Sequence, residues 1–163
     1  NVTISKGTKG DNLITKIGDS NLFMTGTHVA HDCLIGNKNI FANQATLAGH
    51  VKICDNVIIG GLSAVQQFIT IGSYSMIGGM SGVDKNIMPA SLVIGNRAKL
   101  RGLNLVGLRR ANFSNEEIRK IENIHSNINI INDFRKDPSN SKIVDMFDYY
   151  LKIQNKKIGF IKE

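Results

Sequence analysis

Three of the four histidines in the chain lie close together in sequence. His28, His31 and His50 fall within a stretch of twenty-three residues, and Asp32 follows His31 directly. An imidazole can act as a general base toward a hydroxyl when a neighbouring group orients its ring. Gly49 leaves its backbone N–H open to approach, which suits an oxyanion formed during acyl transfer. These residue types therefore suggest histidine-catalysed transfer of an acyl group.

Two other interpretations of the histidine cluster stay open at this point. Histidines that point outward from a folded chain are often solvated surface residues, and on spacing alone this is the simpler account. Three histidines can also hold a zinc ion. Their pattern, His-x2-His with a third histidine nineteen residues further on, is not that of an established zinc site, so we predict no metal here.

The histidines lie within a six-residue repeat that continues without a break from residue 17 to residue 88. The second position of each hexad is mostly small, and the fifth is small or β-branched. The first positions are all apolar: Ile17, Phe23, Val29, Ile35, Phe41, Leu47, Ile53, Ile59, Val65, Ile71, Ile77 and Val83. A fixed short period of this kind indicates a solenoid, in which each repeat buries its apolar face against its neighbours.

Strand alternation explains the repeat. The fifth position of one hexad and the first position of the next lie two residues apart, so both face inward. Three hexads close one triangular coil of eighteen residues, and successive coils stack at a strand spacing of roughly 4.8 Å. We expect the small second position to permit a tight turn after each strand. The sequence thus predicts a parallel β-helix over residues 1–95.

The same stacking predicts how the polar residues are arranged. Residues eighteen apart lie one above the other, so His31, Gly49 and Gln67 should form one column on the outer wall. His50 should lie one coil away from His31, and His28 should lie just before it in the same coil. The repeat therefore predicts a cluster of imidazoles outside the apolar core.

Residues 96–163 have a different, helical pattern. Ser114 and Glu117 form a capping box ahead of an apolar stripe with helical spacing. The stripe is Ile118, Ile121, Ile124 and Ile128, and a second one contains Ile143, Phe147, Tyr150 and Leu151. We therefore predict a C-terminal α-helical domain, in which His125 is a packing or surface residue.

The net charge of +7 is concentrated in the helical part. Residues 1–95 contain six Lys and Arg against five Asp and Glu, whereas residues 96–163 contain fourteen against eight. This excess suits either a solvated helix surface or a docking surface for an acidic protein or a phosphorylated substrate. Nucleic acid is disfavoured because the basic residues lack interleaved aromatics and a recognisable binding motif.

Other features of the sequence limit where the protein works. No apolar run approaches about 18 residues, so we predict no membrane span. Cys33 and Cys54 occupy packed positions of the repeat, which is typical of free thiols in a reducing cytoplasm. The chain starts abruptly with a strand at residues 2–4 and a loop at Gly10-Asp11-Asn12, with nothing to cover the first coil. We therefore expect it to be the C-terminal part of a longer protein, with earlier coils preceding it.

The hexads resemble those of the hexapeptide-repeat acyltransferases, whose coils wind left-handed. Longer runs resemble one family among them, the bacterial UDP-N-acetylglucosamine O-acyltransferases. The matching runs are THVAHDC at 27–33, ANQATLAGHV at 42–51, IIGG at 58–61, GNRA at 95–98 and GLNLVGLRR at 102–110. The resemblance covers essentially the whole chain. It implies a left-handed parallel β-helix followed by helices.

The resemblance also implies a function. Members of this family transfer an (R)-3-hydroxyacyl group from acyl carrier protein to the 3-hydroxyl of UDP-N-acetylglucosamine, which commits this nucleotide sugar to lipid A synthesis. They work in the cytoplasm as homotrimers, with active sites between adjacent subunits, and need no metal or dissociable cofactor. Acyl carrier protein is acidic, which fits the basic excess of residues 96–163.

Roles in the family fall on matching positions of this chain. The catalytic base falls on His31, the carboxylate that orients it on Asp32, and the oxyanion donor on the backbone N–H of Gly49. The glycine that leaves the acyl groove open to a longer chain falls on Gly79. Substrate-contacting positions fall on His28, His50, Gln66, Gln67, Asn104 and Arg110. Gln66 departs from the family pattern, because a third substrate-side histidine usually stands there.

Related functions on the same scaffold remain as alternatives. The N-acyltransferase of the same pathway uses an amine acceptor in place of a hydroxyl, and the run at 102–110 favours the O-acyl enzyme. A metalloenzyme of the carbonic anhydrase type would need stoichiometric zinc. A non-catalytic trimeric scaffold would lose nothing when its histidines are replaced.

Overall fold

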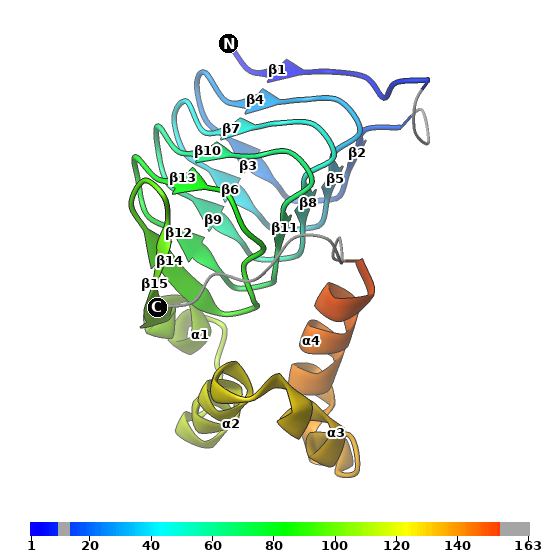
Figure 1. The fold of residues 1–163 in the computed structure, drawn as a ribbon, viewed down its shortest axis with the longest axis vertical. Coiled ribbons are helices and arrows are strands. Elements are labelled where there is room, and N and C mark those ends of the chain that lie inside the picture. The colour runs from blue at the N-terminus through cyan, green and yellow to red at the C-terminus, as the bar shows by residue number, and fades with distance from the viewer. Residues whose placement is uncertain (10–13, 154–163) are drawn as a thin grey trace.

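The computed structural model describes residues 1–9 and 14–153, and they form a left-handed parallel β-helix followed by a group of helices (Figure 1). Almost every strand is two residues long and takes the sixth position of one hexad and the first of the next. The coils stack along one axis, and the strands of successive coils make three parallel sheets that we call A, B and C. The predicted fold class is confirmed.

The chain passes through sheets A, B and C in turn, once per coil. Sheet A contains β1 (Thr3–Ile4), β4 (His28–Val29), β7 (Thr46–Leu47), β10 (Ala64–Val65) and β13 (Gly82–Val83). Sheet B contains β2 (Lys16–Ile17), β5 (Leu34–Ile35), β8 (Lys52–Ile53) and β11 (Thr70–Ile71). Sheet C contains β3 (Leu22–Phe23), β6 (Ile40–Phe41), β9 (Ile58–Ile59), β12 (Met76–Ile77), β14 (Ser91–Ile94) and β15 (Lys99–Leu103).

The interior of the coils is built from the positions that the repeat predicts. From Val29 onward the first-position residues are at most 4% exposed. Fifth-position residues such as Cys33, Ala45 and Val51 are fully buried. Side chains eighteen residues apart also stack, and the rings of Phe23 and Phe41 lie 4.6 Å apart at 6°. Alternating large and small side chains therefore fill a narrow core, as expected.

The turns differ from the prediction in one respect. The left-handed backbone conformation falls on the fourth position of the hexad, which is usually not glycine; Asp32, for example, has φ 58° and His50 has φ 61°. The second position of the hexad is small for a different reason, because a larger side chain there would clash with the next coil. A Cβ atom on Gly60 would lie 2.5 Å from the backbone nitrogen of Gly79 in the next coil. Glycine is therefore needed there because adjacent coils approach closely.

Sheet C continues beyond the hexads. Strand β14 pairs with β12 in parallel and with β15 in antiparallel fashion. The domain boundary expected after residue 95 lies inside this β14–β15 hairpin, and the first helix begins at Leu105. The helical segments are α1 (Leu105–Arg110), α2 (Asn115–Ser126), η1 (Ile128–Ile130), α3 (Ile131–Phe134), η2 (Pro138–Asn140) and α4 (Ser141–Ile153).

The helices have a second apolar core of their own, at the last coils of the β-helix (Figure 1). The predicted capping box is present, because Ser114 Oγ accepts from the Glu117 backbone N–H while the Glu117 carboxylate accepts from the Ser114 N–H. Helix α4 turns back along sheet B, and Lys52 Nζ donates to the Ile153 carbonyl oxygen over 2.8 Å. Both predicted apolar stripes contribute to the buried core: Ile118, Ile121, Ile124, Ile143 and Phe147.

Within the described residues, no helix has both the length and the apolar character needed to cross a membrane. Cys33 and Cys54 are buried, unpaired thiols, as predicted. Burial raises the pKa of Cys33 to about 11 and that of Cys54 to about 12. Both side chains are therefore protonated packing groups at neutral pH.

His125 links α2 to the end of the β-helix. Its Nε2–H donates to the Pro89 carbonyl oxygen over 2.7 Å, and its ring meets Phe147 edge-on. Burial is the larger influence on this imidazole and lowers its pKa. His125, expected from the sequence to be a packing or surface residue, thus packs between α2 and the β-helix, and its neutral form is favoured in the folded protein.

We expect His125 to make the protein less stable in mild acid. The unfolded chain takes up a proton at the ordinary imidazole pKa of about 6.5, whereas the folded chain resists protonation to lower pH. The free energy of unfolding should therefore fall as the pH drops below about 6.5, by at most about 1.4 kcal/mol per pH unit for one proton. Urea unfolding of wild type and His125→Gln between pH 7.5 and 5 measures this difference. Glutamine can still donate to Pro89 but does not titrate, so parallel curves for the two proteins would contradict the prediction.

Candidate functional site

The predicted catalytic residues lie in the turns that lead from sheet A to sheet B, which we call the A/B corner. Apart from the first coil, the coils make this turn at the same place on the prism, so its third and fourth hexad positions form two columns. The third-position column is His31, Gly49 and Gln67, and the fourth-position column is Asp32, His50 and Phe68. The structure thus brings together the residues that spacing placed in one column.

His31 and Asp32 form a hydrogen-bonded pair at this corner. His31 Nδ1 and Asp32 Oδ2 lie 2.8 Å apart. Because an ionised carboxylate can only accept, Nδ1 carries the proton in this pair and the neutral ring keeps its lone pair on Nε2. The imidazole is 43% exposed, whereas the carboxylate side chain is only 2% exposed. The pair therefore presents Nε2 to incoming molecules and keeps the carboxylate behind it.

The Asp32 carboxylate is held by a residue that sequence analysis did not single out. The Thr8 backbone N–H donates to Asp32 Oδ1 over 2.9 Å, and the Thr8 hydroxyl donates to Oδ2 over 2.6 Å. The Thr8 hydroxyl, followed by the His31 hydrogen bond, lowers the Asp32 pKa to about 2 against the opposing effect of burial. Asp32 is therefore ionised whenever His31 is required to act as a base.

Gly49 lies directly against the imidazole of His31. A Cβ atom at this position would be 2.7 Å from His31 Cε1 and 2.8 Å from Nε2, so a side chain there would displace the ring. Among the residues that the structure describes, none accepts a hydrogen bond from the Gly49 N–H. This backbone donor beside Nε2 is what a developing oxyanion requires.

Aromatic rings continue along the A/B corner. The His31 and His50 rings lie 5.1 Å apart in an edge-to-face arrangement, and His50 stacks on Phe68 at 4.6 Å and 14°. Sequence analysis did not identify Phe68, although its spacing of eighteen residues from His50 could have revealed it. The ring of Phe68 fixes the orientation of His50 on one side, while His31 meets it on the other.

The donor atoms of His31, Asp32 and His50 lie within 4.8 Å of one another, which is close enough for a metal ion. The Asp32 carboxylate, however, already accepts three hydrogen bonds. Its Oδ2 faces His31 Nδ1, and both of its oxygens accept from Thr8. A metal ion at Asp32 would compete with His31 Nδ1–H and with Thr8 for this carboxylate, so the arrangement fits a supported base better than a metal centre.

The other predicted substrate contacts near this corner lie on its two sides. His28 faces outward from β4, where its Nδ1 hydrogen-bonds to Thr3 Oγ1 over 2.7 Å. Gln66 and Gln67 are exposed at the end of β10, one coil beyond Gly49. These side chains lie along the same outer wall as His31 without belonging to its hydrogen-bonded pair.

Asn104 and Arg110 lie elsewhere on the chain, in a largely apolar cavity of about 560 Å³. Asn104 also has a structural task, because its Oδ1 accepts from the Gly107 N–H at the start of α1 and its Nδ2 donates to the Tyr74 carbonyl oxygen. The cavity lies where sheet C meets the first helix. It is lined by Lys38, Ile40, Asn56, Ile58, Tyr74, Met76, Leu92, Asn104, Val106, Gly107, Arg110 and Ala111.

Gly79 lies at a third place, in the turn from sheet C to sheet A. A Cβ atom there would lie 3.3 Å from the Gly61 carbonyl oxygen and meet no side chain within 4 Å. A single chain therefore carries the predicted site residues in three separate groups: the A/B corner, the cavity at α1, and the turn of Gly79.

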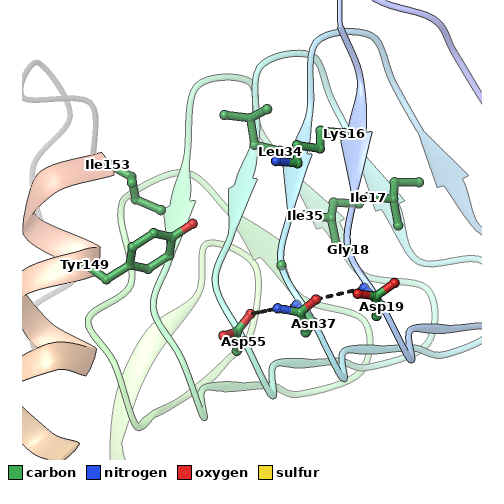
Figure 2. A pocket seen from close by; sticks show the side chains of 11 residues that line it. Lys16, Ile17, Gly18, Asp19, Leu34, Ile35, Asn37, Asp55, Tyr149 and Ile153 are labelled. Atoms are coloured by element: carbon green, nitrogen blue, oxygen red, sulfur yellow. Dashed lines mark hydrogen bonds between the residues drawn. The ribbon is translucent and has the colours of Figure 1, made fainter.

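A further cavity, of about 610 Å³, opens between the first strands of sheet B and the end of α4, where Tyr149 and Ile153 face the strands (Figure 2). Its polar groups join successive coils. The Asp19 N–H donates to Asn37 Oδ1 over 2.8 Å, and the Asn37 N–H donates to Asp55 Oδ1 over 2.6 Å (Figure 2). Because these side chains satisfy the backbone of the turns, we assign them a structural role.

Comparison with known proteins supports the sequence resemblance. A family model described as UDP N-acetylglucosamine O-acyltransferase, domain 2, matches residues 87–143. A protein of Paracoccus denitrificans named acyl-[acyl-carrier-protein]--UDP-N-acetylglucosamine O-acyltransferase is 50% identical over 123 residues, which are 76% of this chain and 47% of that protein. The chain thus spans about half the length of the curated relatives it matches.

Solved structures agree over nearly the whole chain. The UDP-N-acetylglucosamine O-acyltransferase of Moraxella catarrhalis superposes with a TM-score of 0.83 at 34% identity, covering 98% of this chain and 65% of that one. The UDP-N-acetylglucosamine acyltransferase of Francisella novicida superposes with a TM-score of 0.87 at 26% identity, covering 99% and 62%. From its repeat, its fold and these relatives, the chain belongs to the UDP-N-acetylglucosamine O-acyltransferase family.

Proposed function

We propose that the protein transfers an (R)-3-hydroxyacyl group from acyl carrier protein to the 3-hydroxyl of UDP-N-acetylglucosamine. The observation that carries this proposal is the His31–Asp32 pair beside the N–H of Gly49, which donates to none of the described residues. The proposed substrates are those in the names of the relatives, which are called acyl-[acyl-carrier-protein]--UDP-N-acetylglucosamine O-acyltransferases. The reaction is the entry step of lipid A synthesis.

The proposed mechanism uses only groups of this site. His31 Nε2 removes the proton of the sugar hydroxyl as the oxygen attacks the thioester carbonyl carbon. The Gly49 N–H donates to the oxyanion of the tetrahedral intermediate, and ionised Asp32 stabilises the imidazolium. The C–S bond then breaks, and the imidazolium returns its proton to the departing thiolate of the carrier. The products are the O-acylated sugar nucleotide and the free carrier thiol.

The three groups of site residues can act together only if different subunits contribute them. We propose a homotrimer, in which the A/B corner of one subunit faces the Asn104–Arg110 cavity or the Gly79 turn of its neighbour. Light scattering of the full-length protein should report the mass of three subunits. A fully active monomer would rule out shared sites.

Gly79 in this arrangement leaves room for the distal part of the acyl chain. The basic surface of residues 96–163 suits docking of an acidic carrier protein, since opposite charges steer association. The buried free thiols of Cys33 and Cys54 are consistent with work in a reducing cytoplasm.

The deciding experiment mixes the full-length protein with UDP-N-acetylglucosamine and a panel of 3-hydroxyacyl carrier proteins. Mass spectrometry should detect one acyl group on the sugar nucleotide. The corresponding 3-amino sugar nucleotide is the matched acceptor, and faster acylation of its amine would favour an N-acyltransferase. Stoichiometric zinc together with carbon dioxide hydration would favour a metalloenzyme, and no reaction with any donor would favour a scaffold.

A further inference from the structure

The first coil of the described β-helix is interrupted beside the catalytic pair. Thr3 of β1 pairs with His28, which is 25 residues further on, whereas His28 pairs with Thr46 at the regular distance of 18. The connection from β1 to sheet B therefore contains seven residues more than the same connection in a regular coil. Two described residues of this longer connection, Thr8 and Thr15, contact Asp32 at the A/B corner.

The longer connection also supplies a different acceptor for one backbone N–H of the turn, that of the fourth-position residue. In later coils the N–H of the fourth-position residue donates to the carbonyl of a third-position residue in the coil before it. His50 N–H to the His31 carbonyl at 3.0 Å and Phe68 N–H to the Gly49 carbonyl at 3.1 Å are examples. The Asp32 N–H donates instead to the Thr15 hydroxyl at 2.9 Å. The turn that carries Asp32 is thus held by threonine side chains of this connection.

We propose that Thr8 is a positioning residue for the base, acting on His31 through Asp32; this inference rests on the acyl transfer proposed above. Thr8 donates hydrogen bonds to both oxygens of the Asp32 carboxylate, one from its N–H and one from its hydroxyl. A carboxylate held at two points cannot rotate about its last bond, so Oδ2 stays aimed at His31 Nδ1. The ring is then fixed with Nε2 toward the hydroxyl that it deprotonates.

The pKa of Asp32 supports this role. The Thr8 hydroxyl is the largest influence that lowers it, and the value of about 2 keeps the carboxylate an acceptor for Nδ1–H at every pH at which the enzyme works. Without the hydroxyl, the carboxylate loses one of its two anchors. His31 would then sample other orientations and the second tautomer.

The test compares Thr8→Val with Thr8→Ser in the full-length protein. Valine keeps the shape and the backbone N–H but removes the hydroxyl, so we expect kcat to fall roughly 10-fold, the effect of losing a hydrogen bond to a charged group. The KM for UDP-N-acetylglucosamine should stay within about twofold, because Thr8 does not reach the substrate. Thr8→Ser restores the hydroxyl and should recover most of the rate.

A double-mutant cycle separates positioning from a general structural effect. If Thr8 acts through Asp32, Thr8→Val should cost nothing further in an Asp32→Asn background. An equal loss in both backgrounds, or a wild-type kcat for Thr8→Val, would overturn the inference.

The histidine ¹⁵N NMR spectrum provides a readout independent of turnover. Wild type should show His31 in the Nδ1–H tautomer, and Thr8→Val should show a mixture; an unchanged tautomer would also overturn the inference. Failure of the proposed function would look different, because the wild-type protein would then transfer no acyl group while the spectra still report on Thr8.

Discussion

Replacement of His31 by alanine should lower kcat by roughly 10²–10⁴-fold, the usual contribution of a positioned general base. The reason is that Nε2 is the basic atom beside the Gly49 N–H, a donor that no described residue takes up, while Nδ1 is hydrogen-bonded to Asp32. Binding of UDP-N-acetylglucosamine should change far less, because a base acts mainly in the transition state. Initial rates and the KM for the sugar nucleotide, measured with one hydroxyacyl carrier protein, test this directly.

Two neighbouring variants show whether the roles are assigned correctly. His50→Ala should weaken substrate binding more than turnover, since the His50 ring lies between those of His31 and Phe68, whereas Asp32 Oδ2 is hydrogen-bonded to His31 Nδ1. Asp32→Asn should give an intermediate loss of kcat, because the amide keeps the shape but supports the imidazolium poorly. Near-normal turnover of His31→Ala together with an inactive His50→Ala would mean that the roles are exchanged.

Gly49→Ala should be almost as damaging, although it adds only one methyl group. That Cβ atom would lie 2.7 Å from His31 Cε1, too close for van der Waals contact, so the ring has to move. A displacement of about 1 Å can cost roughly 10²-fold in rate, and we expect a loss of kcat of this size. The fold should survive, because the imidazole is partly exposed and can swing outward.

The matched control is Gly61→Ala. Gly61 takes the same third position of its hexad at another corner, where the added Cβ atom would lie 3.2 Å from the Asn43 carbonyl oxygen and near no histidine. Because Gly61 stacks on Gly79 at this corner, the comparison uses a donor with a short acyl chain. With this donor the kcat of Gly61→Ala should stay close to that of wild type. Equal rates for the two variants would show that Gly49 has no special relation to the base. Thermal unfolding of both proteins confirms that each is folded.

The repeating part of this protein could be predicted residue by residue. In the non-repeating part, the helices and the capping box could be predicted, but the contacts between distant residues could not. The period of six fixes which side chains face inward, and the coil of eighteen places Gly49 on His31. The backbone of the turns was wrongly explained, because a glycine needed for space and one needed for its φ angle look alike in sequence. Asn104 was predicted only as a substrate contact. Its position just before Leu105 also suits a helix cap, which the structure shows it to be.

Thr8 is the clearest example of a site residue that could not be predicted from the sequence. It lies outside the hexads, and its contact with Asp32 spans 24 residues across a connection whose path no period determines. Phe68 could have been predicted from the repeat, because it stands eighteen residues after His50. A search of the fourth-position column would have found it, whereas only the folded chain could reveal Thr8.

The left-handed conformation at the fourth position has a consequence for how such a site can evolve. The residues that adopt it are as different as Asp32, His50, Leu62, Phe68 and Met80. Leu62 and Met80 are 60% and 74% exposed, so neither is selected for packing within this chain. The backbone cost of this conformation, about 1–2 kcal/mol for an L-residue and less for Asp or Asn, is set by the backbone and not by what the side chain does outside. One residue can therefore replace another there with little change in folding energy, so mutation can explore new chemistry at these corners while the scaffold stays constant.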